Sequence, residues 1–306
     1  MRSALLWGSQ NRWLERQFRS RAFAKQAVAR FMPGERPEDA LAESSSLSER
    51  GIQSVLTCLG ENVSSKAQVE AIVTDYLDLM DRIGAAELPT HVSVKLTHLG
   101  LDLDRDLTVR NLVRLAARAA EHRHTFWVDM EYSRYVDATL DVFEAARRER
   151  ENLALCLQAY LHRTPEDLER IAGAGAAVRL VKGAYAEPAS VAIPSKAEVD
   201  ERFEELSLRL IELYDGRGQP HGLATHDVPL LRRVASEAAR RGWGKDRWEV
   251  QMLYGIQRSA QNQLAAEGYT VRVLISYGEA WFPWYMRRLA ERPANVGFVL
   301  RSMMGG

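Results

Sequence analysis

The stretch Ala177-Val178-Arg179-Leu180-Val181-Lys182 is a short apolar run that carries two basic residues. Runs of this length, rich in β-branched side chains, indicate a buried strand. A second pattern follows it, in which many apolar side chains recur at spacings of three and four, the period of a helix buried on one face. These side chains are Phe203, Leu206, Leu208, Leu210, Ile211 and Leu213. The stretch therefore predicts one strand followed by one helix.

The same unit recurs along the chain. Eight apolar runs alternate with helical patterns, which predicts strands at residues 52–59, 91–97, 125–130, 153–160, 177–182, 221–225, 248–253 and 270–275. Thr164-Pro165-Glu166 and Asp227-Val228-Pro229 are typical helix starts, and glycines are expected to close helices at 84, 173, 216, 242 and 268. Eight such units without a long linker predict an α/β fold, a closed (βα)8 barrel of the TIM type.

An open doubly wound sheet is the alternative. Such a sheet commonly carries a glycine-rich phosphate turn after its first strand. The nearest candidate, Gly173-Ala174-Gly175, ends a helix and precedes a strand, which favours a C-cap turn instead. The barrel is therefore the preferred interpretation.

Composition limits the class of protein. The chain has 306 residues, 46% of them hydrophobic, and a formal net charge of zero, which argues against a nucleic-acid-binding surface. A TIM-type barrel uses roughly 250 residues, so we expect an N-terminal helical arm at residues 1–45 and one barrel at residues 46–306. No apolar run approaches the roughly 18 residues that span a bilayer. Cys58 and Cys156 lie in apolar runs, which favours reduced thiols in a cytosolic compartment.

The first 31 residues are rich in arginine and hold a single acid, Glu15, as in a mitochondrial presequence. They also carry large apolar side chains at helical spacings, which favours an amphipathic helix packed on the domain. A membrane-surface helix is a third interpretation. The side chains concerned are Trp7, Trp13, Leu14, Phe18, Phe23, Val28 and Phe31.

Polar residues near the carboxyl ends of the predicted strands are the candidate site, because barrel enzymes place their chemistry there. Burying an unpaired charge costs several kcal/mol, so Lys95, Asp129 and Arg179 should find partners inside the barrel mouth. Structural roles are the alternative: Lys95 pairing with Asp129, Gln158 and Thr225 bonding loop backbone, and His226 serving as scaffold. The full set is Lys95, Asp129, Gln158, Arg179, Lys182, Thr225, His226, Glu249 and Gln251.

The segment Trp284-Tyr285-Met286-Arg287-Arg288-Leu289-Ala290-Glu291 places two adjacent arginines among aromatic residues. Arginine grips a carboxylate through two parallel charge-assisted hydrogen bonds, so the pair indicates a carboxylate ligand. A solvated helix face, with both arginines within reach of Glu291, is the alternative. No metal-ligand spacing and no Gly-x-Ser-x-Gly motif occurs, so we expect no metal site and no acyl transfer.

Seven motifs together resemble the proline dehydrogenase family, in order and in strand position. The resemblance covers roughly residues 20–301 and is to the monofunctional bacterial members. The motifs are Val94-Lys95-Leu96, Val128-Asp129-Met130-Glu131, Leu157-Gln158-Ala159-Tyr160, Arg179-Leu180-Val181-Lys182-Gly183-Ala184-Tyr185, Ala224-Thr225-His226-Asp227, Glu249-Val250-Gln251-Met252-Leu253 and Tyr285-Met286-Arg287-Arg288-Leu289-Ala290-Glu291.

The resemblance implies a distorted barrel that binds FAD non-covalently and oxidises L-proline to Δ1-pyrroline-5-carboxylate, the first step of proline catabolism to glutamate. It also implies electron transfer to a membrane quinone and a separate downstream pyrroline-5-carboxylate dehydrogenase. A cytoplasmic protein with peripheral contact to the inner face of the membrane is expected on the same ground. Schiff-base chemistry at Lys182 or Lys95, as in a class I aldolase, and a non-catalytic carboxylate-binding module remain alternatives from other classes.

By the same resemblance, Asp129 and Arg179 are catalytic, and no metal takes part. Substrate contacts are implied for Lys95, Asp129, Tyr185, Leu253, Arg287, Arg288 and Glu291. Flavin contacts are implied for Met130, Gln158, Arg179, Lys182, Gly183, Ala184, Thr225 and His226. Leu274 stands where bifunctional members carry a tyrosine, with Tyr277 three residues on, so oxidation of a related cyclic amino acid such as hydroxyproline stays open.

Overall fold

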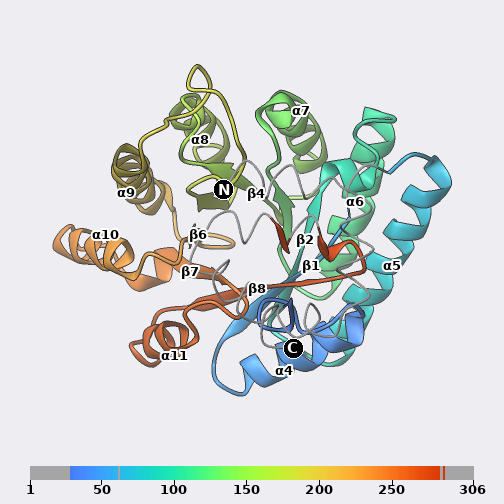
Figure 1. Cartoon of the computed structure of the whole chain (residues 1–306), viewed down its shortest axis with the longest axis horizontal. Helices are drawn as coiled ribbons and strands as arrows, with labels where there is room; N and C mark the ends of the chain where they lie inside the picture. The colour runs from blue at the N-terminus through green and yellow to red at the C-terminus, as the bar shows by residue number, and fades with distance from the viewer. Residues whose placement is uncertain (1–27, 61–62, 283–284, 287–306) are drawn as a thin grey trace, which may run out of the picture.

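The computed structural model describes residues 28–60, 63–282 and 285–286. Within these residues eight parallel strands close into a barrel in the order of the sequence (Figure 1). Every predicted strand is present, within a few residues of its expected bounds. The strands are β1 (Gln53–Cys58), β2 (Thr90–Lys95), β3 (Phe126–Asp129), β4 (Leu153–Gln158), β5 (Val178–Val181), β6 (His221–Ala224), β7 (Trp248–Leu253) and β8 (Val271–Tyr277).

Pairing between the first and last strands closes the barrel. β1 pairs with β2 on one side and with β8 on the other, and Val55 lies opposite Leu274 in the second pairing. In an open doubly wound sheet, β1 and β8 would be separate edge strands or would stand elsewhere in the strand order, and they would not pair with each other. The prediction of a TIM-type barrel is confirmed, and the open sheet is wrong.

Helices follow the strands and form the outer ring that Figure 1 shows around the barrel. They are α5 (Lys66–Ala85), α6 (Arg105–Glu121), α7 (Val136–Arg147), α8 (Thr164–Ala172), α9 (Lys196–Leu213), α10 (Val228–Arg240) and α11 (Arg258–Ala266). Short 3-10 helices lie at Leu96–Leu99, Ser133–Tyr135 and Lys245–Arg247. Before the barrel, α4 (Pro37–Ser48) packs on β1 and β8, so it runs through the expected arm boundary at residue 45.

The helix starts follow from capping, with one difference from expectation. Asp227 caps α10 as predicted, because its carboxylate accepts a hydrogen bond from the backbone N–H of Leu230. Thr164 does not cap α8; its hydroxyl donates to the carbonyl of Gln158 at 2.5 Å. Gly84 lies inside α5 rather than after it. A Cβ at this position would stand 2.1 Å from Nδ1 of His122, so glycine leaves room for the histidine ring.

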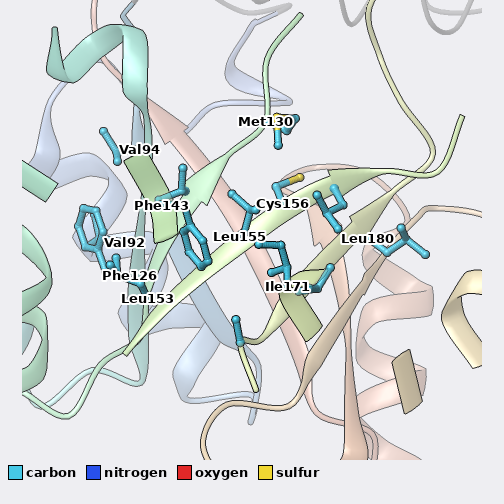
Figure 2. Close-up of a cluster of buried hydrophobic side chains, with 14 of the residues drawn as sticks. Val92, Val94, Phe126, Met130, Phe143, Leu153, Leu155, Cys156, Ile171 and Leu180 are labelled. Atoms are coloured by element: carbon cyan, nitrogen blue, oxygen red, sulfur yellow. The ribbon is translucent and has the colours of Figure 1, made fainter. Parts of the chain in front are cut away.

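Two parts of the apolar core are set by the alternation of side chains along each strand. One part lies between the strands and the helices, and Figure 2 shows Phe143 of α7 and Ile171 of α8 beside Leu155 of β4. The other is the smaller cluster of Val55, Trp127, Ala154 and Ala177, against which Leu274 packs half-buried. Tyr277 belongs to the larger part of the core.

Both cysteines are free thiols, as the sequence predicted. Cys156 is buried in the core, and burial raises the pKa of its thiol to about 12. A thiol with so high a pKa stays protonated near neutral pH and packs as a small apolar group. Across the described ranges, no helix combines the length and apolar character that a membrane span requires.

Candidate active site

A buried arginine and a carboxylate from two strands form the centre of the site. Arg179 of β5 is 3% exposed, and its Nη1 donates to Oδ1 of Asp129 on β3 at 2.7 Å. Ser93 of β2 donates to the same carboxylate oxygen at 2.6 Å and lies 3.3 Å from Nη1 of Arg179. The expectation that Asp129 and Arg179 find partners in the barrel is therefore confirmed, and the two charges are partners of each other.

Arg179 is held on two further sides. Its Nε donates to Oε1 of Gln251 on β7 at 2.6 Å, and its guanidinium carbon lies 4.6 Å from the centre of the Trp127 ring. The remaining amino group, Nη2, is buried and has no hydrogen-bond partner among the groups that the structure describes. A buried donor without a partner costs about 1–3 kcal/mol. The arrangement therefore fits a bound ligand that offers an acceptor to Nη2.

Trp127 is itself fixed by a histidine from the neighbouring strand. Its indole N–H donates to Nδ1 of His91 on β2 at 3.2 Å, so Nδ1 must be unprotonated. Burial, together with the positive charge of Arg272, lowers the pKa of His91 well below its usual range. A neutral imidazole can accept this hydrogen bond at neutral pH, so the ring under Arg179 keeps one orientation.

A second buried ion pair lies beneath Gln251. Gln251 donates through Nε2 to Oε1 of Glu249 at 2.6 Å, and Arg272 of β8 contacts both oxygens of Glu249 at 2.8 and 3.0 Å. Glu249 is 1% exposed and Arg272 2%. Arg272 also donates to the carbonyl of Ser54 at 3.2 Å. The interior of the barrel therefore holds two charge-balanced pairs joined by one neutral amide.

The end of β5 turns sharply after Lys182. Gly183 has a φ of +121°, and a Cβ at this position would stand 2.2 Å from Cδ1 of Tyr160. The backbone N–H of Tyr160 donates to the carbonyl of Lys182 at 3.0 Å. Glycine is needed for both the backbone angle and the contact with the tyrosine ring.

Lys182 lies between two carboxylates. Its Nζ donates to Oδ2 of Asp227 at 3.0 Å and also to Asp200 of α9. Partial burial acts to raise the pKa of Asp227, but the hydrogen bonds from Lys182 and from the backbone N–H of Leu230, together with the charge of Lys182, outweigh it, so the pKa lies below the usual value. Lys182 therefore ties the β5–α9 loop to α9 and to the start of α10.

Two further predicted residues bond backbone, as the structural alternative proposed. Nε2 of Gln158 donates to the carbonyl of Glu131 at 2.9 Å, and Oγ1 of Thr225 accepts from the N–H of Asp227 at 3.2 Å. The carboxylate of Glu131 accepts in turn from Thr97, from its hydroxyl at 2.8 Å and its N–H at 3.2 Å. These bonds hold the loops after β2, β3 and β6 in fixed positions.

The other described candidates lie around the same end of the barrel. Lys95 follows Ser93 by two residues and Leu253 follows Gln251 by two, so each continues a barrel-facing row toward the mouth. Both are half-buried, as are Ala184, Tyr185 and His226, whereas Met130 is buried. The ring of Tyr185 lies 4.2 Å from that of Tyr132, which closes the site beside β3.

The predicted carboxylate clamp, Arg287 and Arg288 with Glu291, lies outside the described residues. The helical residues just before it pack in a cluster with the start of the described chain: Val28, Phe31, Met32, Leu59, Trp281, Phe282, Tyr285 and Met286. The indole N–H of Trp281 donates to Oε1 of Glu35 at 2.7 Å. The segment that leads into the tandem arginines is therefore anchored to residues 28–35.

Sequence reasoning did not assign Ser93 or Trp127 to the site. Both precede a predicted site residue by two positions, Ser93 before Lys95 and Trp127 before Asp129, so the period-two alternation of a strand was the available signal. Gln251 was identified only as a polar residue of the seventh strand. Within residues 28–60, 63–282 and 285–286, no group of three or more His, Cys, Asp and Glu is placed to hold a metal ion.

Fold and site together define an enzyme of the (βα)8 barrel class. The model of the proline dehydrogenase family matches residues 40–301. Proline dehydrogenase of Deinococcus radiodurans is 38% identical over 282 residues, which cover 90% of each chain. Proline dehydrogenase 2 of Bacillus subtilis (strain 168) is 36% identical over 257 residues, which cover 84% of each chain. The chain belongs to the proline dehydrogenase family.

Solved structures agree on the fold. Proline utilization A from Bdellovibrio bacteriovorus, inactivated by N-propargylglycine, superposes with a TM-score of 0.80 at 21% identity and covers 94% of this chain. A mutant of proline utilization A from Bradyrhizobium japonicum gives a TM-score of 0.74 at 25% identity. The chain spans 38% and 33% of the length of these two proteins. At such identities the likeness is evidence for the barrel.

Proposed function

We propose that this chain is an FAD-dependent enzyme that oxidises L-proline to Δ1-pyrroline-5-carboxylate. The observation that carries the proposal is the buried Arg179, with two of its three nitrogens occupied and Nη2 left for a ligand. When bound, FAD supplies the oxidant, accepting a hydride from a ring carbon of the substrate. The cationic guanidinium of Arg179 favours the negative charge that collects on its ligand during that step.

The flavin side of the site is proposed to come from three neighbouring strands. Gln158 of β4, the Lys182–Gly183–Ala184 turn after β5, and Thr225 and His226 after β6 are consecutive around the barrel, with Met130 beside them. Lys182 is already matched by Asp200 and Asp227, so its side chain holds loops together rather than supplying spare positive charge. Its part in cofactor binding is therefore assigned to the backbone of the turn.

The substrate side is proposed to hold a small zwitterion with an apolar ring. Arg287 and Arg288 would grip the carboxylate, with Lys95 in support and Glu291 orienting an arginine. Leu253 and Tyr185 would contact the ring, and the carboxylate of Asp129 would face the secondary amine. Held in this way, the substrate presents one ring carbon to the oxidant and excludes water from it.

The wider role is proposed from family membership. Electrons would pass to a membrane quinone through peripheral contact with the inner face of the membrane. The product would go to a separate pyrroline-5-carboxylate dehydrogenase, in a cytoplasmic setting. We also propose the division into an arm at residues 1–45 and a catalytic barrel at residues 46–306.

An absorption spectrum tests the proposal directly. Purified protein should show the yellow absorption of bound flavin, and anaerobic addition of L-proline should bleach it. A colourless protein that added FAD does not restore would overturn the proposal. Covalent trapping of a carbonyl substrate by borohydride at Lys95 or Lys182 would instead support the Schiff-base alternative.

A further inference from the structure

Gln251 is a neutral residue placed between the two buried ion pairs of the barrel. We propose that Gln251, with its amide fixed by Glu249, is a positioning residue that aims Nη2 of Arg179 at the flavin. The inference rests on the proposed function and extends it to a residue that need not touch substrate or cofactor itself.

The orientation of the Gln251 amide is set by its two neighbours. A carboxylate only accepts hydrogen bonds and a guanidinium only donates them. The NH2 end must therefore face Oε1 of Glu249, at 2.6 Å, and the carbonyl end must face Nε of Arg179, also at 2.6 Å. Glu249 cannot turn away, because Arg272 holds both of its oxygens. The amide has one orientation that satisfies every partner.

The intervening strand makes room for this contact. β6 lies between β5 and β7, and its Gly222 is level with Arg179 on one side and with Glu249 on the other. A Cβ at position 222 would stand 2.4 Å from Nε2 of Gln251. The glutamine side chain therefore crosses over β6 at a glycine and reaches the arginine on β5.

These contacts prevent the guanidinium of Arg179 from rotating. Bonds at Nε and Nη1 fix the plane, and the Trp127 ring covers one face, so Nη2 points in a single direction. Because Gln251 is neutral, it also leaves the net charge around Arg179 unchanged. Asp129 already balances Arg179, and a second carboxylate in place of Gln251 would make the pocket net negative, which opposes formation of a negative ligand.

The experiment compares the midpoint potential of bound flavin in the wild type and in Gln251→Met, measured by spectroelectrochemical titration. Methionine keeps the length of the side chain but offers Nε no comparable acceptor. We expect the equilibrium constant for flavin reduction to fall about tenfold, which is about 30 mV for a two-electron couple. The turnover number should fall by a similar factor, whereas the proline KM should change little.

Asn111→Leu is the matched control. Asn111 is a buried amide on α6 that bonds the carbonyl of Leu99, away from Arg179. Its loss should lower stability without moving the potential. If Gln251→Met does not fold, Glu249→Leu/Arg272→Met provides the comparison, since it removes a buried pair together and leaves Gln251 without its fixed acceptor. The midpoint potential of the bound flavin should then also fall, but by less than in Gln251→Met.

The outcomes separate the two proposals. A wild-type protein that binds no flavin overturns the proposed function. If the wild type binds flavin and Gln251→Met matches the control, losing stability while keeping the wild-type potential, then Gln251 is merely structural and the present inference is wrong.

Discussion

Removal of the Asp129 carboxylate tests the central ion pair. Arg179 is 3% exposed, and in Asp129→Ala it loses the partner that lies 2.7 Å from its Nη1. Breaking a buried pair on one side costs about 3–5 kcal/mol. Since the Asp129 side chain is 18% exposed, we expect the lower end, about 3 kcal/mol.

Urea unfolding, followed with and without excess FAD, measures this loss, because a bound cofactor would itself add stability. Asp141→Ala is the control: its carboxylate lies 3.6 Å from Arg105, both side chains are more than half exposed, and the cost should stay below about 1 kcal/mol. Asp129→Ala/Arg179→Met should be more stable than Asp129→Ala, because no buried charge is left alone. The reasoning fails if Asp129→Ala costs no more than the control, or if the double variant loses the sum of both single effects.

Three further outcomes are expected. Gly183→Ala should destabilise the folded protein by about 1–3 kcal/mol and lower flavin content, because alanine is strained at a φ of +121° and collides with Tyr160; urea unfolding and flavin absorbance check it. His221 accepts a hydrogen bond from the backbone N–H of Val178, and burial lowers its pKa to about 4. Its contribution to stability should therefore be constant above pH 6.5 and decline as the pH falls toward 4. Unfolding at pH 5 and pH 7 should show a smaller decline in His221→Asn, and an equal decline would contradict the assignment. Arg288→Met should raise the proline KM far more than it changes flavin content, and equal loss of both would show that the clamp is misassigned.

Most of the fold could be predicted from the sequence because each strand and each helix carries its own periodicity. The runs around Leu155 and Leu180 are apolar and β-branched or leucine-rich, and the stretches between them repeat at three and four residues. Closure was harder to predict, since it depends on β1 pairing with β8, which no local pattern encodes. Only the count of eight units indicated it.

The candidate site was predicted by residue type and position, but its contacts were not. Asp129 and Arg179 lie on strands that are not neighbours, and their pairing across the barrel depends on side-chain length. The contact of Gln251 with Arg179 depends in turn on the glycine at position 222. The ion pair of Lys182 could not be predicted for the same reason, because Asp200 lies on α9, eighteen residues further along the chain. Long-range contacts of this kind follow from the closed barrel and are absent from any short window of sequence.

The bond from Arg272 to the carbonyl of Ser54 joins residues 218 positions apart. During synthesis, β1 therefore cannot pair with β8 until nearly the whole barrel has left the ribosome. Until then, the emerging chain exposes an unpaired edge that other chains can join. Newly made copies of this protein should depend on protection from aggregation late in translation, and a chain cut short before residue 272 should fail to close.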